Sequence, residues 1–282
     1  MPSSNSEPAG QIQAAEKRQP AIELQDACLS FGERTLWDNL SFSVMPGEFV
    51  AVLGPNGCGK TTLLRVLLGL QELDRGTVRV AGQSARRGNR EVGYIPQQKM
   101  LPENTPLRGR DLVALGVQGH RWGPGLPSRK TKARVNELIS RVKAESFADR
   151  PVGLLSGGEQ QRLRAVQAVA GKPRVLLCDE PLLSLDLNHQ RAVSSLIHQQ
   201  TVDQDSAVLF VTHEINPVLP FVDKVLFLAG GRFNMGHPDE VLTSEVLSDL
   251  YGSHIDVLRS KNRVAIVGLP DGIAHNHQEG TF

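Results

Sequence analysis

The distribution of apolar residues along the chain divides it into short strand-like runs and longer helix-like stretches. Apolar and polar positions alternate in 21–31, 40–54 and 76–82, and glycine or proline separates these runs, which is typical of β-strands joined by turns. Two later segments, 174–180 and 206–213, are apolar runs that end in polar residues, and a helix-like stretch lies between them. Continuous apolar runs that alternate with helices predict buried parallel strands joined by crossover helices. The pattern therefore predicts an α/β fold with a mostly parallel core sheet.

The middle of the chain does not follow this alternation. Residues 98–155 are polar and interrupted by proline, with a helical stretch around 132–142. We interpret about 98–165 as a mainly helical subdomain that is inserted into the core. Beyond the core, 224–233 predicts another strand with a turn, and 240–251 predicts a helix.

The two ends of the chain differ from the core between them. Residues 1–20 are rich in Ser, Pro, Gln and Glu and hold few large apolar side chains, which predicts a disordered tail. At the other end, 263–268 predicts a last strand and 270–282 is a polar tail. We therefore expect one domain over 21–250, followed by a C-terminal extension over 251–282.

Composition excludes several classes of protein. The 31 basic and 30 acidic residues leave a net charge of +1, which gives no overall electrostatic reason to expect nucleic acid as a partner. No stretch approaches the ~18 apolar residues that cross a bilayer, and the N-terminus lacks an apolar signal segment, so we expect a cytosolic chain. The three cysteines lack C-x-x-C spacing and predict neither a disulfide framework nor a zinc site.

Residues 54–62 read GPNGCGKTT and match the phosphate-loop pattern G-x-x-x-x-G-K-[ST]. The string follows the strand predicted at 49–53 and precedes a helix with leucines at helical spacing, which is the context that a phosphate loop requires. The alternative is a glycine-rich turn that only caps this helix. In a phosphate loop, Lys60 would bridge the β- and γ-phosphates of a nucleotide and the Thr61 hydroxyl would bind Mg²⁺. The predicted ATP-binding residues of this segment are Gly54, Pro55, Asn56, Gly57, Cys58, Gly59, Lys60, Thr61 and Thr62.

Two adjacent carboxylates end the apolar run at 174–180. Asp179 would lie at the carboxyl end of a buried strand and bind Mg²⁺, while Glu180 would hold and polarise the attacking water. Two acids at this place can also be a strand end that meets solvent, so the pair alone leaves both interpretations open.

The segment 155–171, LSGGEQQRLRAVQAVAG, connects these elements. Ser156 and two glycines begin a helix, and the N-terminus of a helix favours anions. LSGGEQQ resembles the signature of ATP-binding cassette (ABC) ATPases and precedes Asp179 as it does in that family. The resemblance covers about 21–250 and implies a P-loop NTPase cassette with a mostly parallel core sheet, an N-terminal antiparallel β portion and an inserted helical subdomain. We call Ser156, Gly157 and Gly158 the signature tip.

The resemblance also implies roles for residues elsewhere. Phe31 matches the aromatic residue that stacks on adenine, although tyrosine is commoner there. Gln97 in YIPQQ matches the glutamine that joins the core to the helical subdomain and senses Mg²⁺ and water, with Gln98 beside it as the alternative. Asp186, in Ser-Leu-Asp, belongs to the loop that crosses between subunits. His213 in VTHE matches the histidine that contacts the γ-phosphate.

In the family, two cassettes pair head to tail, so the phosphate loop of one faces the signature tip of the other across ATP. With one phosphate loop per chain, the resemblance implies a homodimer that hydrolyses Mg-ATP at the cytoplasmic face of the cell membrane. The lack of a spanning segment favours an importer with separate permease subunits and, indirectly, an extracytoplasmic solute-binding protein. Soluble cassettes that act on DNA or ribosomes are the rival class, but no long coiled coil or zinc module is inserted here.

The solute is suggested by family likeness alone. VTHEINPV and EVLSDLYGSHIDVL resemble the ATPase subunits of zinc and manganese importers, and iron–siderophore or cobalamin importers are the alternative. His275 and His277 suggest a metal-sensing tail, or simply a solvated one. Cys58, beside Lys60 at a helix N-terminus, is expected to have a lowered pKa and to react with alkylating agents unless nucleotide shields it, or it merely replaces a serine.

Overall fold

The computed structural model describes residues 18–98, 100–119, 128–261 and 263–268. The predicted tail at 1–20 lies almost wholly outside these residues, as do 270–282 with His275 and His277. Within the described residues, no helix combines the length and the apolar character that crossing a bilayer would need.

The N-terminal part forms an antiparallel sheet with the strand order β2-β1-β4-β5. The apolar residues of its long strands alternate inward, with Ile22, Leu24 and Leu40 fully or almost fully buried. This sheet confirms the predicted antiparallel portion, although the sequence did not indicate β5. Its strands are β1 (Ile22–Phe31), β2 (Arg34–Val44), β4 (Arg75–Val80) and β5 (Gln83–Ser84).

The core sheet has the order β10-β9-β3-β8-β7-β6 and is parallel except for the β9–β10 hairpin. Every residue of β3, β7 and β8 is buried, because helices or the other sheet cover both faces. The predicted parallel α/β core is confirmed. Its strands are β3 (Phe49–Leu53), β6 (Val92–Ile95), β7 (Val175–Asp179), β8 (Ala207–Val211), β9 (Lys224–Ala229) and β10 (Arg232–Gly236).

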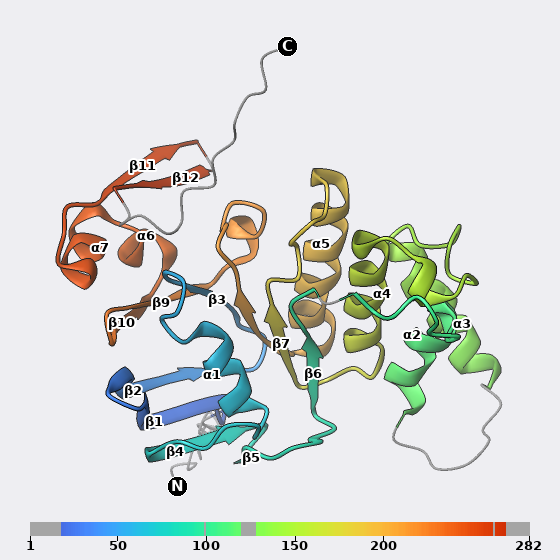
Figure 1. The fold of residues 1–282 in the computed structure, drawn as a ribbon, viewed down its shortest axis with the longest axis horizontal. Coiled ribbons are helices and arrows are strands. Elements are labelled where there is room, and N and C mark those ends of the chain that lie inside the picture. Colours follow the sequence, from blue (N-terminus) through green and yellow to red (C-terminus); the bar gives the residue numbers. More distant parts are fainter. Residues whose placement is uncertain (1–17, 99, 120–127, 262, 269–282) are drawn as a thin grey trace, which may run out of the picture.

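Two apolar cores lie on opposite faces of this sheet, and β3 contributes to both. Val50 and Val52 pack toward the antiparallel sheet and helix α1 (Lys60–Leu67). Phe49 and Ala51 pack on the other face, in the same core as helix α5 (Leu187–Gln204). The phosphate loop therefore begins at a strand held from both sides (Figure 1).

The stretch predicted to be mainly helical holds three helices, seen in green on the right of Figure 1. They are α2 (Gly109–Gln118), α3 (Arg129–Arg141) and α4 (Gly157–Ala170), with a short 3-10 turn η1 (Val152–Leu154) before α4. Helices α2 and α4 approach closely because Gly116 has no side chain: a Cβ there would lie 2.1 Å from the carbonyl oxygen of Gln167. The sequence analysis did not predict α2, because its two glycines resemble turn residues.

The C-terminal part packs on the core sheet beyond β10. The helix predicted over 240–251 is divided into α6 (Pro238–Val241) and α7 (Ser244–Tyr251), because Thr243 caps the start of α7. The predicted last strand is β12 (Arg263–Val267), and its antiparallel partner β11 (Asp256–Ser260) was not predicted. A 3-10 turn, η2 (Leu219–Phe221), lies between β8 and β9.

Candidate functional site

The phosphate loop joins β3 to α1 in a conformation that its glycines permit. Gly54, Gly57 and Gly59 all have positive φ, at 144°, 78° and 102°. Nζ of Lys60 donates hydrogen bonds to the carbonyl oxygens of Gly54 (2.8 Å) and Pro55 (3.0 Å). Lys60 is 6% exposed, and burial lowers its pKa. The loop thus wraps around a buried cation, which is the arrangement expected of an anion site.

Two side chains that sequence reasoning missed hold this loop from the antiparallel sheet. Nε1 of the buried Trp37 donates to the carbonyl oxygen of Cys58 (3.1 Å), and Arg34 donates to that of Gly57 (2.9 Å). A Cβ on Gly59 would lie 2.6 Å from Nε1 of Trp37, so only glycine fits there. Both contacts join residues far apart in sequence, and no local pattern could have indicated them.

Asp179 lies at the end of β7 and faces the start of α1. Oγ1 of Thr61 donates a hydrogen bond to its Oδ1 (3.3 Å). Asp179 is 1% exposed, and burial, with the nearby Glu180 charge, raises its pKa. Tyr94 on β6 hydrogen-bonds the same carboxylate, and burial together with Asp179 raises the pKa of Tyr94 to about 12. A buried carboxylate beside a hydroxyl is an oxygen donor set that suits a hard cation.

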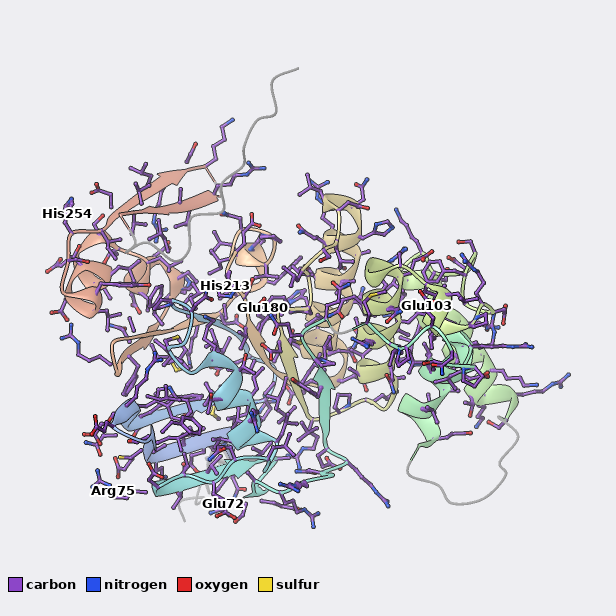
Figure 2. All side chains as sticks on the ribbon, in the orientation of Figure 1. Glu72, Arg75, Glu103, Glu180, His213 and His254 are labelled. Atoms are coloured by element: carbon purple, nitrogen blue, oxygen red, sulfur yellow. The ribbon has the colours of Figure 1, made fainter. Side chains whose placement is uncertain are left out.

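Glu180 is held by two neighbours that the resemblance had named. Nε2 of His213 donates to its Oε1 (2.6 Å), and Nε2 of Gln97 donates to its Oε2 (3.1 Å). The hydrogen bond from His213 lowers the pKa of Glu180 despite its partial burial, so the carboxylate is ionised at neutral pH. The backbone at Glu180 is left-handed, with a φ of 48°. Figure 2 shows Glu180 and His213 together near the centre of the molecule.

One cavity of about 300 Å³ gathers half of the predicted site residues, and Asp179 is not in its lining. Gln97, Glu180 and His213 line it together with the phosphate loop, so residues from four separate segments of sequence meet there. The full lining is Asn56, Gly57, Gly59, Lys60, Thr61, Thr62, Gln97, Glu180 and His213. An ionised carboxylate facing a cationic loop across a small cavity can orient a water toward a bound phosphate.

The two adjacent glutamines differ in what they touch. Gln97 reaches Glu180, whereas the Gln98 side chain packs against Gly157, where a Cβ would lie 1.8 Å from its Nε2. Of the two, Gln97 therefore has the geometry that fits a site residue, and Gln98 lies between the site and the signature tip.

The signature tip lies apart from this cavity, at the N-terminus of α4. Oγ of Ser156 accepts from the backbone N–H of Glu159 (3.4 Å), and Oε2 of Glu159 accepts from the N–H of Ser156 (2.8 Å), which is a capping box. Ser156 is exposed. The described residues that line the phosphate-loop cavity include none from the signature tip.

Asp186 and Phe31 also lie outside the cavity. Oδ1 of Asp186 caps α5 by accepting from the N–H groups of Asn188 and His189, both at 3.0 Å. Phe31, at the end of β1, is 52% exposed. It pairs with Arg34, the first residue of β2, across the turn between the two strands.

The prediction of a lowered pKa for Cys58 was wrong. Burial raises the pKa of this thiol, and the opposing effects of Lys60 and the backbone do not outweigh it. The sequence indicated the neighbouring cation and the helix N-terminus but not the loss of water around the sulfur. All three cysteines are free thiols, as the absence of C-x-x-C spacing predicted.

Comparison with known proteins matches the chain to ABC transporter proteins throughout. The sequence model described as ABC transporter matches residues 37–183. The manganese transport system ATP-binding protein MntB of Halalkalibacterium halodurans is 28% identical over 89% of this chain and 99% of its own. The zinc import ATP-binding protein ZnuC 1 of Hahella chejuensis is 33% identical over 83% of this chain and 84% of its own.

More distant functions and solved structures match as well. Import ATP-binding proteins for sulfate/thiosulfate, from Bordetella pertussis, and spermidine/putrescine, from Pasteurella multocida, are 34% and 33% identical, and the chain covers 68% and 62% of their lengths. A solved metal-chelate type ABC transporter in an inward-facing conformation has a TM-score of 0.72 and 28% identity, covering 88% of this chain and 96% of that one.

Proposed function

The chain belongs to the ABC transporter family and is an ATPase of the importer type, and we propose that it drives uptake of a divalent metal, zinc or manganese. ATP is its substrate, and hydrolysis takes place at the carboxyl edge of the core sheet. The observation that supports a metal as the solute is the match to a manganese transport protein over 99% of that protein's length. The segments VTHEINPV and EVLSDLYGSHIDVL point to the same class.

In this proposal, Lys60 and the N–H groups of the phosphate loop bind the phosphates of ATP. Lys60 now donates to the carbonyl oxygens of Gly54 and Pro55, and phosphate oxygens would replace these partners. Glu180 holds the attacking water, since its carboxylate is ionised and faces the loop. His213 and Gln97 orient that carboxylate through their hydrogen bonds to it. His213 is also the residue that would contact the γ-phosphate. Phe31 stacks on adenine.

The residues present fit a magnesium ion. Thr61 and Asp179 would hold it, because a hydroxyl and a buried carboxylate lie 3.3 Å apart and both are oxygen ligands of the kind that Mg²⁺ prefers. The described residues hold no group of three or more His, Cys, Asp or Glu side chains that could bind a metal unaided, so phosphate oxygens and water would complete the ligand set. When bound, Mg²⁺ supplies charge neutralisation on the phosphates.

We propose that two copies pair head to tail around two ATP molecules. The signature tip of one copy, an exposed capped helix N-terminus, would face the phosphate loop of its partner. Asp186 would lie at the crossing between the subunits. The dimer would act at the cytoplasmic face of the membrane on separate permease subunits, supplied by an extracytoplasmic solute-binding protein and without nucleic acid.

The test is to delete the gene and to measure cellular zinc, manganese and iron together with uptake of each ion. Complementation with the wild-type chain should restore uptake, whereas the Glu180→Gln variant should not. A deficit of zinc or manganese that only the wild-type chain corrects supports the proposal. Normal zinc and manganese in the deletion strain would contradict it.

A second candidate is uptake of an iron–siderophore complex or cobalamin. The similarity to a metal-chelate type transporter over 96% of that chain favours it. The same deletion strain separates the candidates, because this one predicts an intact zinc and manganese content with loss of labelled siderophore or cobalamin uptake. Co-purification with ribosomes or DNA in place of a membrane partner would favour a soluble cassette.

A further inference from the structure

The loop that follows β8 is tied to the C-terminal hairpin through one side chain. Nδ2 of Asn216 donates a hydrogen bond to the carbonyl oxygen of Val264 (3.0 Å), and the N–H of Val264 donates to Oδ1 of Asn216 (2.9 Å). Val264 belongs to β12, which pairs with β11 but lies outside both larger sheets. The amide of Asn216 thus occupies the side of β12 that faces the core.

The geometry of an antiparallel strand explains why one asparagine can do this. The N–H and C=O of a single residue in such a strand point to the same side, so a primary amide can pair with both. The contact is also partly shielded from water, because Val264 is 6% exposed and shares the larger apolar core with Ile215 and Val218, which flank Asn216. The hairpin is therefore a packed part of the molecule at this point, not a mobile appendage.

His213 lies on the same loop, three positions before Asn216. The loop is held at its first residue, where the N–H of Glu214 donates to Oγ1 of Thr212 (3.1 Å) and Thr212 is buried. The Asn216 pairing holds it on the other side. His213, whose ring reaches Glu180 at 2.6 Å, is thus carried between two anchors, of which one belongs to the C-terminal extension (Figure 1).

We propose that Asn216 is a positioning residue for hydrolysis, and that the β11–β12 hairpin acts through it to fix the His213 loop. This inference rests on the proposed role of His213, and it assigns a function to the hairpin that the ATPase core does not require for binding nucleotide. Loss of the pairing should allow the loop to move, so that His213 spends less time on Glu180. Lys60 and the rest of the phosphate loop would keep their contacts.

The experiment compares Asn216→Ala and Asn216→Asp with the wild-type full-length chain in steady-state ATP hydrolysis. For Asn216→Ala we expect kcat to fall about tenfold while KM for ATP stays within about twofold, because only the orientation of His213 changes. Asn216→Asp keeps the acceptor for the Val264 N–H but places a second oxygen against the Val264 carbonyl oxygen. Its kcat should therefore lie between those of the wild-type chain and Asn216→Ala. Asn89→Ala is the matched control: Asn89 is a half-buried loop asparagine that accepts from the N–H of Glu91 (3.0 Å), and its loss should leave kcat unchanged.

A double-mutant cycle separates positioning from a general structural role. In a His213→Ala background, single-turnover hydrolysis should show no further loss from Asn216→Ala, because the side chain that Asn216 positions is already absent. A kcat of Asn216→Ala within twofold of wild type, or an undiminished tenfold loss in the His213→Ala background, would overturn the inference. If His213→Ala itself hydrolyses ATP at the wild-type rate, the assigned role of His213 is wrong and the inference falls with it. A negative metal-uptake result, by contrast, refutes the proposed solute and leaves this inference standing.

Discussion

The phosphate-loop cavity and the signature tip both lie at the N-terminus of a helix, but they differ in how many polar groups one chain gathers there. The cavity brings together a buried lysine, a carboxylate fixed by two donors and a hydroxyl, all from one chain. The signature tip has one exposed helix N-terminus, and its polar groups are satisfied by the capping box with Glu159. The cavity therefore holds several groups that could contact a substrate, whereas the signature tip offers only an exposed helix N-terminus.

This difference supports the proposed pairing of two copies. A helix N-terminus attracts an anion, but a lone tip offers few donors and no counter-charge to hold it. The cavity, in turn, has no lining residue from the signature tip of its own chain in the part that the structure describes, so in the proposed dimer that tip would come from the partner. In the proposed dimer, the cavity of one copy would supply the cation and the carboxylate, and the signature tip of the other would supply the helix N-terminus.

The largest effect should come from Glu180→Gln. The amide keeps the shape of the side chain but cannot accept a proton from water, so we expect hydrolysis to fall by about a hundredfold or more. ATP binding should persist, and dimers should accumulate with ATP in size-exclusion chromatography, because the closed state is no longer consumed. Turnover at the wild-type rate would show that another group activates the water.

Mixing two inactive variants should restore activity if the sites are shared. Lys60→Ala removes the phosphate loop's cation, and Ser156→Ala alters the signature tip, so each homodimer lacks two functional sites. In an equimolar mixture, half the dimers carry one intact site, and we expect about a quarter of the wild-type rate. If each site were built from a single chain, the mixture would show only the mean of the two variants.

Ser156→Ala should also lower stability by a smaller, separable amount. Loss of an N-cap costs about 1 kcal/mol of the free energy of unfolding, which corresponds to a fall in Tm of roughly 2–4 °C. Ser128→Ala is the control, since Ser128 caps α3 by accepting from the N–H of Thr131 (3.1 Å) but belongs neither to the signature tip nor to the lining of the phosphate-loop cavity. Both variants should lose similar stability, and only Ser156→Ala should lose hydrolysis. Equal loss of hydrolysis in both would attribute it to stability alone.

The smallest effect concerns Cys58. Alkylation requires the thiolate, and burial raises the pKa of this thiol, so its reaction with iodoacetamide should be slower than that of an exposed thiol at neutral pH and should accelerate as the pH rises. The rate can be measured by mass spectrometry, with Cys58→Ser to confirm the site. Fast modification at neutral pH would show that the buried state of the loop is not the one populated in solution.

The sequence predicted those parts of the fold that local pattern decides. The strands β7 and β8 are continuous apolar runs followed by polar residues, and β3 runs directly into the glycine-rich string; the positions of all three match the prediction. β6 was missed because it has four residues and stops directly before Pro96, too short for a periodic signal. β11 was missed because four of its five residues are exposed or polar, and its partner β12 stabilises it.

Site residues that belong to a sequence motif could be predicted. Site residues that reach the site only through the packing of distant elements could not. Lys60, Glu180 and His213 were identified from strings in the sequence, and the structure brings them to one cavity. Trp37 was not identified, because its contact with the phosphate loop depends on how two sheets pack. The predicted direction of the Cys58 pKa shift was wrong for a related reason. Burial of the thiol depends on the whole fold, whereas the sequence displays only neighbours along the chain.

The left-handed backbone at Glu180 has a consequence for how this site can be switched off. A left-handed conformation costs a non-glycine residue about 1–2 kcal/mol, and the hydrogen bond from the N–H of Glu180 to the carbonyl oxygen of Val211 (3.0 Å) helps to hold it. The position of the Glu180 carboxylate therefore depends on an unfavourable value of the main-chain torsion φ. A change in that single torsion would shift the Glu180 side chain relative to His213 and Gln97, with no chemical change to any of the three.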